Sequence, residues 1–263
     1  MGPLDFQSKD LLGRGASLQY PGGLPAHLFL HGFTATPEEL GFLAHTVAQR
    51  GYRVLAPVLP GHGSTPSALA KTRWLDWYQA TEESAAALGA DQAPIVVVGQ
   101  SLGGLLALHL AACRPQWVEG LILLAPAIFL RAWWVETFAA LLPVLARVRP
   151  CWPKGTSDIA DPEARAQRVG YSCVPLRALR ELLTLQRIVR SQVHRVQQRT
   201  LIVQSKLDHT CLWKGVEFLR HGIRGPVKVL TLEQSFHVVS VDYERDVVAA
   251  AIHDFVSPRT SLS

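Results

Sequence analysis

The sequence predicts an α/β fold in which helices flank a mostly parallel central sheet and a helical cap is inserted late in the chain. Two observations predict this fold. Short apolar runs alternate with longer stretches of helical periodicity, which is typical of strand and crossover-helix units. The alternation stops between about residues 128 and 195, where helical patterns follow one another without a strand between them.

The candidate strands are short apolar runs bounded by turn formers or polar residues, and they are expected to pair mostly in parallel. In chain order they are Ala26 to His31, Tyr52 to Val58, Pro94 to Gly99, Gly120 to Pro126, Thr200 to Ser205 and Val227 to Leu232.

The candidate helices lie between these runs and carry apolar residues at helical spacing. They extend from about Pro37 to Arg50, Trp74 to Leu88, Leu102 to Cys113, Trp213 to His221 and Tyr243 to Phe255.

The stretch from about Ile128 to Arg195 breaks this rhythm. It contains "RAWWVETFAALLPVLARV" and "VPLRALRELLTLQRIV", which both have helical periodicity. We interpret the stretch as a helical cap over the strand ends, because ordinary crossover helices would be separated by strands. The predicted organisation is a core made of residues 1–127 and 196–263, with the cap at residues 128–195.

The composition is that of a globular protein with a substantial core, since 48% of the 263 residues are apolar and 18% are charged. No apolar run approaches the about 18 residues that a membrane span needs. The first residues, "MGPLDFQSKDLLGRG", contain neither the basic region nor the apolar run of a secretory signal, so a cytoplasmic location is expected.

The net charge of +5 comes largely from arginines spread over residues 131–199 rather than gathered in a basic tract. Nucleic-acid binding is therefore not expected, although a mildly basic surface could favour anionic membranes or substrates. The cysteines have neither metal-ligand spacing nor a disulfide-dense pattern, and isolated thiols are expected at Cys113, Cys151, Cys173 and Cys211.

A serine stands where a predicted strand meets a predicted helix, in "VVVGQSLGG". Gly99, Ser101 and Gly103 form the pattern Gly-x-Ser-x-Gly, in which small flanking residues allow a strained turn. The turn lifts the hydroxyl above the sheet, where the N–H groups and the positive dipole end of the following helix point. Alternatively, Ser101 only caps that helix.

A candidate acid and a candidate base follow the serine in the chain order that a nucleophilic serine on such a sheet requires. Asp208 follows one predicted strand in "VQSKLDHTC", and His237 follows the next in "LEQSFHVVSVDYERD". Both are expected at the carboxyl edge of the sheet, where Ser101 emerges. As alternatives, Asp208 could cap a helix and His237 could bond a carbonyl. Asp242 and Asp246 are further carboxylates, but they follow the histidine.

The loop after the first strong strand supplies a candidate oxyanion hole. In "LFLHGFTAT", Gly32 lets the backbone turn and aim an N–H at the top of the sheet. The expected donors are the backbone N–H groups of Phe33 and Leu102. A glycine turn at a strand end is common by itself. The serine, the acid, the histidine and the glycine turn, however, are expected on four loops at one edge of the sheet, which makes coincidence the poorer explanation.

With these motifs in place, the sequence resembles the α/β-hydrolases, and within them the bacterial carboxylesterases and monoacylglycerol lipases. The resemblance rests on "HGFTATPEEL", "GHGSTP", "WLDWY", "GQSLGG" and "FHVVSVDYERD" and covers residues 25–255. It implies an α/β-hydrolase fold with Ser101 as nucleophile, Asp208 as acid, His237 as base, and Phe33 and Leu102 as oxyanion donors.

The resemblance and the residues imply the same reaction, which is ester hydrolysis through an acyl-enzyme on Ser101. No metal and no organic cofactor is needed. Other chemistry on this fold stays open, namely a thioesterase, a C–C hydrolase, an amidase or a haloperoxidase. A member that binds a ligand without turnover is a further alternative.

The substrate class has to come from the cap and the loops. The apolar side chains of "RAWWVETFAALLPVL" could line an acyl tunnel or contact a lipid surface transiently, although ordinary cap packing is an equal alternative. The expected partner is a small lipophilic ester, such as a monoacylglycerol or a short-to-medium-chain ester, and nothing in the sequence sets the oligomeric state. The expected substrate contacts are Gly32, Thr34, Gln100, Trp133, Trp134, Phe138 and Val238.

Overall fold

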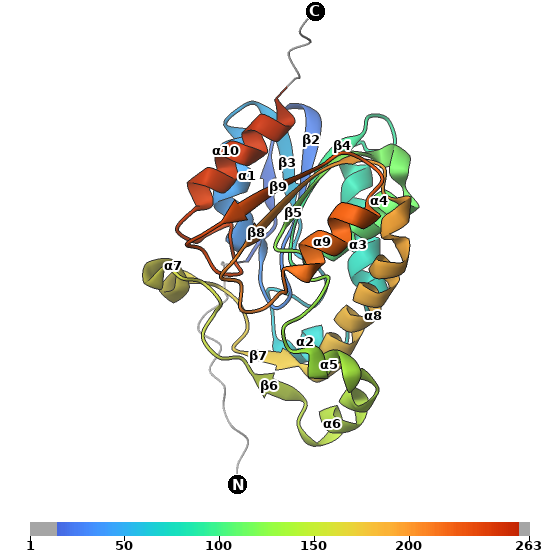
Figure 1. Cartoon of the computed structure of the whole chain (residues 1–263), viewed down its shortest axis with the longest axis vertical. Helices are drawn as coiled ribbons and strands as arrows, with labels where there is room; N and C mark the ends of the chain where they lie inside the picture. The colour runs from blue at the N-terminus through green and yellow to red at the C-terminus, as the bar shows by residue number, and fades with distance from the viewer. Residues whose placement is uncertain (1–14, 258–263) are drawn as a thin grey trace, which may run out of the picture.

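A seven-stranded sheet forms the centre of the computed structural model, which describes residues 15–257 (Figure 1). The strand order is β1-β3-β2-β4-β5-β8-β9, and each neighbouring pair is parallel except β1 with β3. The strands are β1 (Leu18–Tyr20), β2 (Gly23–Leu30), β3 (Tyr52–Ala56), β4 (Ile95–Gln100), β5 (Val118–Leu124), β8 (Arg199–Ser205) and β9 (Val227–Leu232).

The predicted α/β fold is confirmed, and each predicted strand is present with its ends shifted by a few residues at most. The edge strand β1 was not predicted. It has 3 residues, too few to show a period, and pairs antiparallel with β3.

Helices cover both faces of the sheet, as Figure 1 shows. One face packs against α1 (Gly41–Ala48) and α10 (Arg245–Val256), and the other against α3 (Trp74–Ala87), α4 (Leu102–Cys113) and α9 (Lys214–Gly222). Because both faces are buried, all six residues of β4 are buried, which explains its unbroken apolar sequence. Short helical segments complete the core at α2 (Pro66–Leu69), Pro37–Leu40, Pro115–Trp117 and Val193–Arg195.

The insertion between β5 and β8 lies beyond the lower end of the sheet in Figure 1, and its last helix, α8 (Leu176–Gln192), runs back alongside α3 and α4. It also contains a hairpin of β6 (Cys151–Pro153) and β7 (Cys173–Pro175). The expectation that this stretch has no strand is therefore wrong, because strands of 3 residues that contain proline show no alternation. Its other helical segments are α5 (Trp133–Thr137), Ala139–Leu141, α6 (Leu142–Val148) and α7 (Pro162–Gln167).

A disulfide joins Cys151 and Cys173 across this hairpin, with their Cα atoms 5.8 Å apart. The prediction of isolated thiols is wrong for this pair, whereas Cys113 and Cys211 are free. A single pair separated by 22 residues carries no recognisable spacing, because the pairing depends on the hairpin that brings the two strands together.

The proposed boundaries of core and cap stay a prediction. Residues 1–14 and 258–263 of the two core segments lie outside the described residues, as does most of the stretch from which a cytoplasmic location was expected. Among the residues that are described, no helix combines the length and the apolar character needed to cross a membrane.

The closest packing in the core is between the start of α4 and the strands beneath it. A Cβ on Gly103 would lie 1.9 Å from the carbonyl oxygen of Leu30, and one on Gly99 would lie 2.3 Å from the carbonyl oxygen of Gly103. Only glycine fits at these two positions, so both glycines are needed for α4 to begin directly above β2 and β4.

We expect Gly103→Ala to lower the free energy of unfolding by about 3 kcal/mol or more, because the backbone of β2 would have to move. Urea denaturation of the purified variant measures this change. Gly155→Ala is the matched control, since a Cβ there meets nothing within 4 Å. Equal stability of the two variants would contradict the packing argument.

Candidate active site

Ser101 occupies the turn between β4 and α4 in a strained backbone conformation, with φ 53° and ψ −105°. Such a conformation costs a residue other than glycine about 1–3 kcal/mol and persists only where its surroundings hold it. Here the Ser101 N–H donates to the carbonyl oxygen of Leu124 at the end of β5 (2.9 Å), and the Ser101 carbonyl accepts from the Ala127 N–H (3.3 Å). The turn that the Gly-x-Ser-x-Gly pattern predicted is therefore present and anchored on the neighbouring strand.

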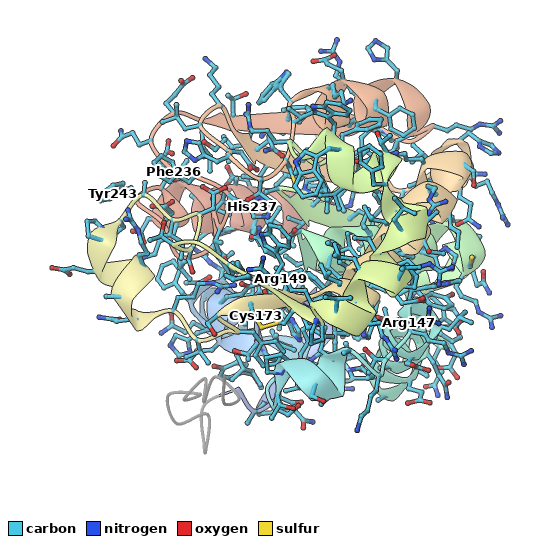
Figure 2. All side chains as sticks on the ribbon, turned by 90° about the horizontal axis from the view of Figure 1, so that it is seen from below. Arg147, Arg149, Cys173, Phe236, His237 and Tyr243 are labelled. Atoms are coloured by element: carbon cyan, nitrogen blue, oxygen red, sulfur yellow. A yellow bond between two sulfur atoms is a disulfide. The ribbon has the colours of Figure 1, made fainter. Side chains whose placement is uncertain are left out.

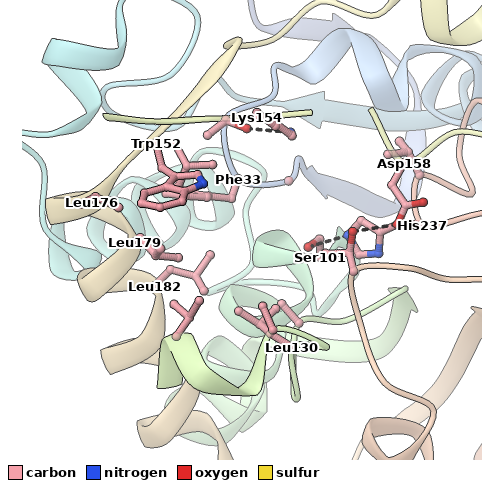
Figure 3. Close-up of a pocket in the computed structure, with 18 of the residues that line it drawn as sticks. Phe33, Ser101, Leu130, Trp152, Lys154, Asp158, Leu176, Leu179, Leu182 and His237 are labelled. Carbon is pink, nitrogen blue, oxygen red and sulfur yellow. Dashed lines mark hydrogen bonds between the residues drawn. The ribbon is translucent and has the colours of Figure 1, made fainter. Parts of the chain in front are cut away.

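The structure brings Ser101, His237 and Asp208 together from the loops that follow β4, β9 and β8. His237 Nε2 lies 3.0 Å from Ser101 Oγ (Figure 3), and His237 Nδ1 lies 2.8 Å from Asp208 Oδ2. This is the geometry in which a histidine can take the serine proton while a carboxylate orients the imidazole.

Hydrogen bonds fix the carboxylate of Asp208. Its Oδ1 accepts from the N–H groups of Thr210 and Cys211, both at 2.7 Å, and its Oδ2 accepts from the side-chain amide of Gln204 at 2.7 Å. Because these donors favour the ionised form, the acid is held as a carboxylate facing His237.

The electrostatics of the pair favour a charged imidazole. Burial by itself lowers the pKa of His237, but the charge and hydrogen bond of Asp208, together with the neighbouring Cys211, outweigh it, so the pKa of His237 lies well above its ordinary value. Burial raises the pKa of Asp208, and the opposite charge and hydrogen bond of His237 bring it below its ordinary value. The arrangement therefore stabilises the imidazolium that forms when the histidine accepts a proton.

Cys211 lies beside this pair, and ligand atoms of Asp208, Cys211 and His237 lie within 4.8 Å of one another. The set resembles a metal site, but both oxygens of Asp208 and Nδ1 of His237 are already engaged in hydrogen bonds. Burial raises the pKa of the Cys211 thiol, which keeps it from becoming a thiolate ligand. The donor set therefore suits orientation of His237 better than coordination of a metal ion.

The predicted oxyanion donors come from the loop after β2 and from the first turn of α4. Leu102 is the first residue of α4, where helical N–H groups have no partner within the helix. In the part of the chain that the structure describes, neither the Phe33 N–H nor the Leu102 N–H donates to a protein acceptor. The loop of Phe33 is fixed on both sides, since the Gly32 N–H donates to Glu39 Oε1 at 2.5 Å and Thr34 adopts a φ of 62°.

Two carboxylates that the sequence did not assign connect the cap to the acid and histidine loops. Asp158, in the cap, accepts from the His209 N–H (3.0 Å) and the Thr210 hydroxyl (2.8 Å), and its carbonyl oxygen accepts from the His237 N–H (3.1 Å). Asp242, considered as an alternative acid, instead accepts from backbone N–H groups of the cap and of Phe236. The cap thus helps to hold two members of the triad in place.

A cavity of about 300 Å³ opens beside Ser101 and His237. Its walls are mostly apolar, and Figure 3 shows Leu130, Leu176, Leu179 and Leu182 gathered on one part of the wall. The leucines of α8 fit its amphipathic pattern, which is why the helix could be predicted. Their position in the cavity wall was not predicted.

The structure separates the seven expected substrate contacts into two groups. Trp133 and Phe138 are 65% and 53% exposed and are not part of the cavity wall. Those in the wall are Gly32, Thr34, Gln100, Trp134 and Val238. Sequence reasoning missed the polar wall residues Glu39, Lys154, Asp158 and Arg168, since isolated charged residues in loops carry no signal of their own.

The family described as "Serine aminopeptidase, S33" matches residues 26–244. The chain belongs to this family of α/β-hydrolases. The resemblance inferred from the motifs is therefore confirmed, and the family match covers the four loops on which the candidate site is built.

Curated relatives are lipases and esterases. A thermostable monoacylglycerol lipase from Bacillus sp. (strain H-257) is 28% identical over 222 residues, which cover 84% of this chain and 86% of that lipase. A carboxylesterase from Bacillus subtilis (strain 168) is 26% identical over 239 residues, which cover 90% of this chain and 94% of that esterase.

Solved structures agree with this assignment. A structure reported for the metagenome-derived lipolytic enzymes LipS and LipT has a TM-score of 0.86 and 27% identity, covering 94% of this chain and 98% of that one. A monoacylglycerol lipase from Paleococcus ferrophilus has a TM-score of 0.77 at 17% identity, covering 91% and 96%, and shares the fold.

We expect Asp208→Asn to lower kcat by about 10⁴-fold, because the amide no longer stabilises the imidazolium or selects its tautomer. The base must be neutral to accept a proton, so activity rises as pH passes upward through the pKa of His237. Loss of the Asp208 charge lowers that pKa, and the acidic limb of the pH profile of kcat/KM should move to lower pH. If the acidic limb of the profile did not move in Asp208→Asn, the pairing of Asp208 with His237 would be contradicted.

We expect Asp158→Ala to lower kcat by about 10–100-fold, because the acid loop loses its contact with the cap and Asp208 shifts relative to His237. Steady-state kinetics on a small neutral ester measure kcat and KM separately. Asp161→Ala is the control, since this cap aspartate caps α7 through its own side chain. An equal effect of the two substitutions would argue against a specific role of Asp158.

Proposed function

We propose that the chain is a serine carboxylic-ester hydrolase acting on lipophilic acyl esters, such as monoacylglycerols or short-to-medium-chain esters. The proposal rests mainly on one observation: Ser101, His237 and Asp208 are hydrogen-bonded in series beside a mostly apolar cavity. The named relatives, a monoacylglycerol lipase and a carboxylesterase, support the same substrate class.

The geometry suits a two-step mechanism. His237 takes the proton of Ser101 as Oγ attacks the ester carbonyl, and the N–H groups of Phe33 and Leu102 bind the developing oxyanion. The alcohol leaves with the proton from His237, which gives an acyl-enzyme. Water, deprotonated by the same histidine, then releases the carboxylic acid and regenerates the serine.

The acyl chain of the substrate fits the apolar part of the cavity. The wall there is built from leucines of α8 and of the segment after β5, and contact with them removes an alkyl chain from water. The favourable free energy grows by about 0.8 kcal/mol for each CH₂ group that is buried. Activity should therefore rise with acyl length until the cavity is filled.

The cap carries an exposed apolar surface that suits transient contact with a lipid surface. Trp133, Phe138 and Val148 are 65%, 53% and 87% exposed. Arg147 and Arg149, both labelled in Figure 2, flank Val148 in the sequence, are exposed and add positive charge beside it. Exposed aromatic and apolar side chains next to arginines favour binding at an anionic lipid interface.

The cytoplasmic location expected from the first residues stays a prediction. The disulfide between Cys151 and Cys173 argues against it, because disulfides persist in oxidising compartments and are rare in the reducing cytosol.

Hydrolysis of p-nitrophenyl esters from C2 to C16 and of 1- and 2-monoacylglycerols tests the proposal. We expect Ser101→Ala to lower kcat by about 10⁴-fold or more, because no other group can form the acyl-enzyme. Ser67→Ala, a change of an exposed serine on α2, is the control.

A folded protein that hydrolyses none of these esters would overturn the proposal. Labelling of the parent protein with a fluorophosphonate then separates the remaining alternatives. Rapid labelling of Ser101 would indicate an activated serine with another substrate, such as a thioester, and no labelling would indicate a ligand-binding member of the fold.

A further inference from the structure

Two cationic side chains lie in the wall of the otherwise apolar cavity. Lys154 follows β6, and Arg168 follows α7, so both come from the cap. In Figure 3, Lys154 lies on one part of the cavity wall, and Leu130 and Leu182 lie on another. Ser101 lies to one side, between these two parts. Lys154 and the leucines therefore lie on different parts of the wall, and Arg168 lies near enough to Lys154 for the two charges to interact.

The two cations have few partners within the protein. Lys154 Nζ donates to the hydroxyl of Thr34 at 3.1 Å. Arg168 Nε is buried and has no hydrogen-bond partner within residues 15–257. Among the described residues neither side chain forms an ion pair. Since guanidinium and ammonium groups each carry several N–H donors, most of this donor capacity is left for a ligand or for water.

The nearby carboxylates of Glu39 and Asp158 partly offset the charge of the cations, but their hydrogen bonds go to other groups. Glu39 accepts the Gly32 N–H at 2.5 Å, and burial raises its pKa, which weakens it as a counter-ion. Asp158 is bound to His209 and Thr210. Burial, and next the charge of Arg168, lower the pKa of Lys154 to about 7, although the charges of Glu39 and Asp158 act in the opposite direction. An anion bound beside Lys154 would favour its charged form.

We propose that Lys154 and Arg168 form a subsite for an anionic group, a carboxylate or a phosphate, on the alcohol side of the ester substrate. This inference rests on the proposed esterase function. An ester has two branches, and the leucine-lined part of the cavity takes the acyl branch. The alcohol branch then extends toward Lys154, because its partner Thr34 directly follows the oxyanion residue Phe33.

The chemistry of the two side chains suits this role. A guanidinium binds carboxylate and phosphate oxygens through paired N–H donors, and an ammonium adds a compact charge beside them. Hydrogen bonds between charged partners in a cavity of low polarity are stronger than those between neutral groups. The subsite would therefore favour esters of hydroxy acids or of phosphorylated alcohols over neutral esters with the same acyl chain.

The test compares esters that share an octanoyl chain and differ in the alcohol. These are 1-octanoylglycerol, 1-octanoylglycerol 3-phosphate and the octanoyl ester of glyceric acid. We expect kcat/KM for one or both anionic esters to exceed that for the neutral ester by about tenfold or more, mainly through KM. Comparing the phosphate with the carboxylate identifies which anion the subsite prefers.

Lys154→Met and Arg168→Met test the residues themselves. In each variant the ratio of kcat/KM for the anionic ester to that for the neutral ester should fall about tenfold. Lys228→Met and Arg224→Met, which remove exposed cations on or before β9, are the matched controls and should keep the ratio. A parent enzyme without preference for either anion, or variants that keep the preference, would overturn the subsite.

Binding to the Ser101→Ala variant separates the subsite from the proposed function. Dodecyl phosphate should bind about tenfold more tightly than dodecanol in calorimetry, and the difference should disappear when Lys154→Met is added. If no ester is hydrolysed but this difference is found, the esterase function fails and the subsite is supported. If esters are hydrolysed and no difference is found, the esterase function is supported and the subsite is overturned.

Discussion

The contact of α4 with β2 and β4 is the constraint on which the candidate site depends. A side chain at Gly103 would collide with the Leu30 carbonyl, so the helix can begin at this point only because the position is glycine. The close approach forces the strained turn at Ser101, and packing of α4, which is buried from Leu102 to Ala112, offsets that strain. The packing of α4 on β2 and β4 therefore helps to place the serine hydroxyl 3.0 Å from His237 Nε2.

The same packing explains the charge distribution around the serine. His237 and Asp208 are both nearly inaccessible to water, and each raises the stability of the charged form of the other. Desolvation opposes both charges, so the pair is stable only because backbone N–H groups and Gln204 also bind the carboxylate. Burial raises the pKa of the neighbouring Cys211 thiol, which favours its neutral form beside this pair.

A feature could be predicted from the sequence where its signal lies within a short stretch of residues. The sheet and the Ser101 turn have local signals, since strands buried on both faces are continuous apolar runs and the glycines flank the serine directly. Asp208 and His237 could be found because parallel strands end at one edge. The hairpin of Cys151 and Cys173 and the cavity cations depend on contacts between distant segments, which no local pattern reports.

The insertion between β5 and β8 contacts both the cavity and the acid and histidine loops through one short segment. Lys154 and Asp158 stand four positions apart, the first facing the cavity and the second bound to the acid loop. The disulfide holds one end of this segment, and the N–H groups of Ala160 and Asp161 bound to Asp242 hold the other. The segment that carries Lys154 is therefore fixed at both ends, and through Asp158 it connects the cavity wall to the loops of Asp208 and His237.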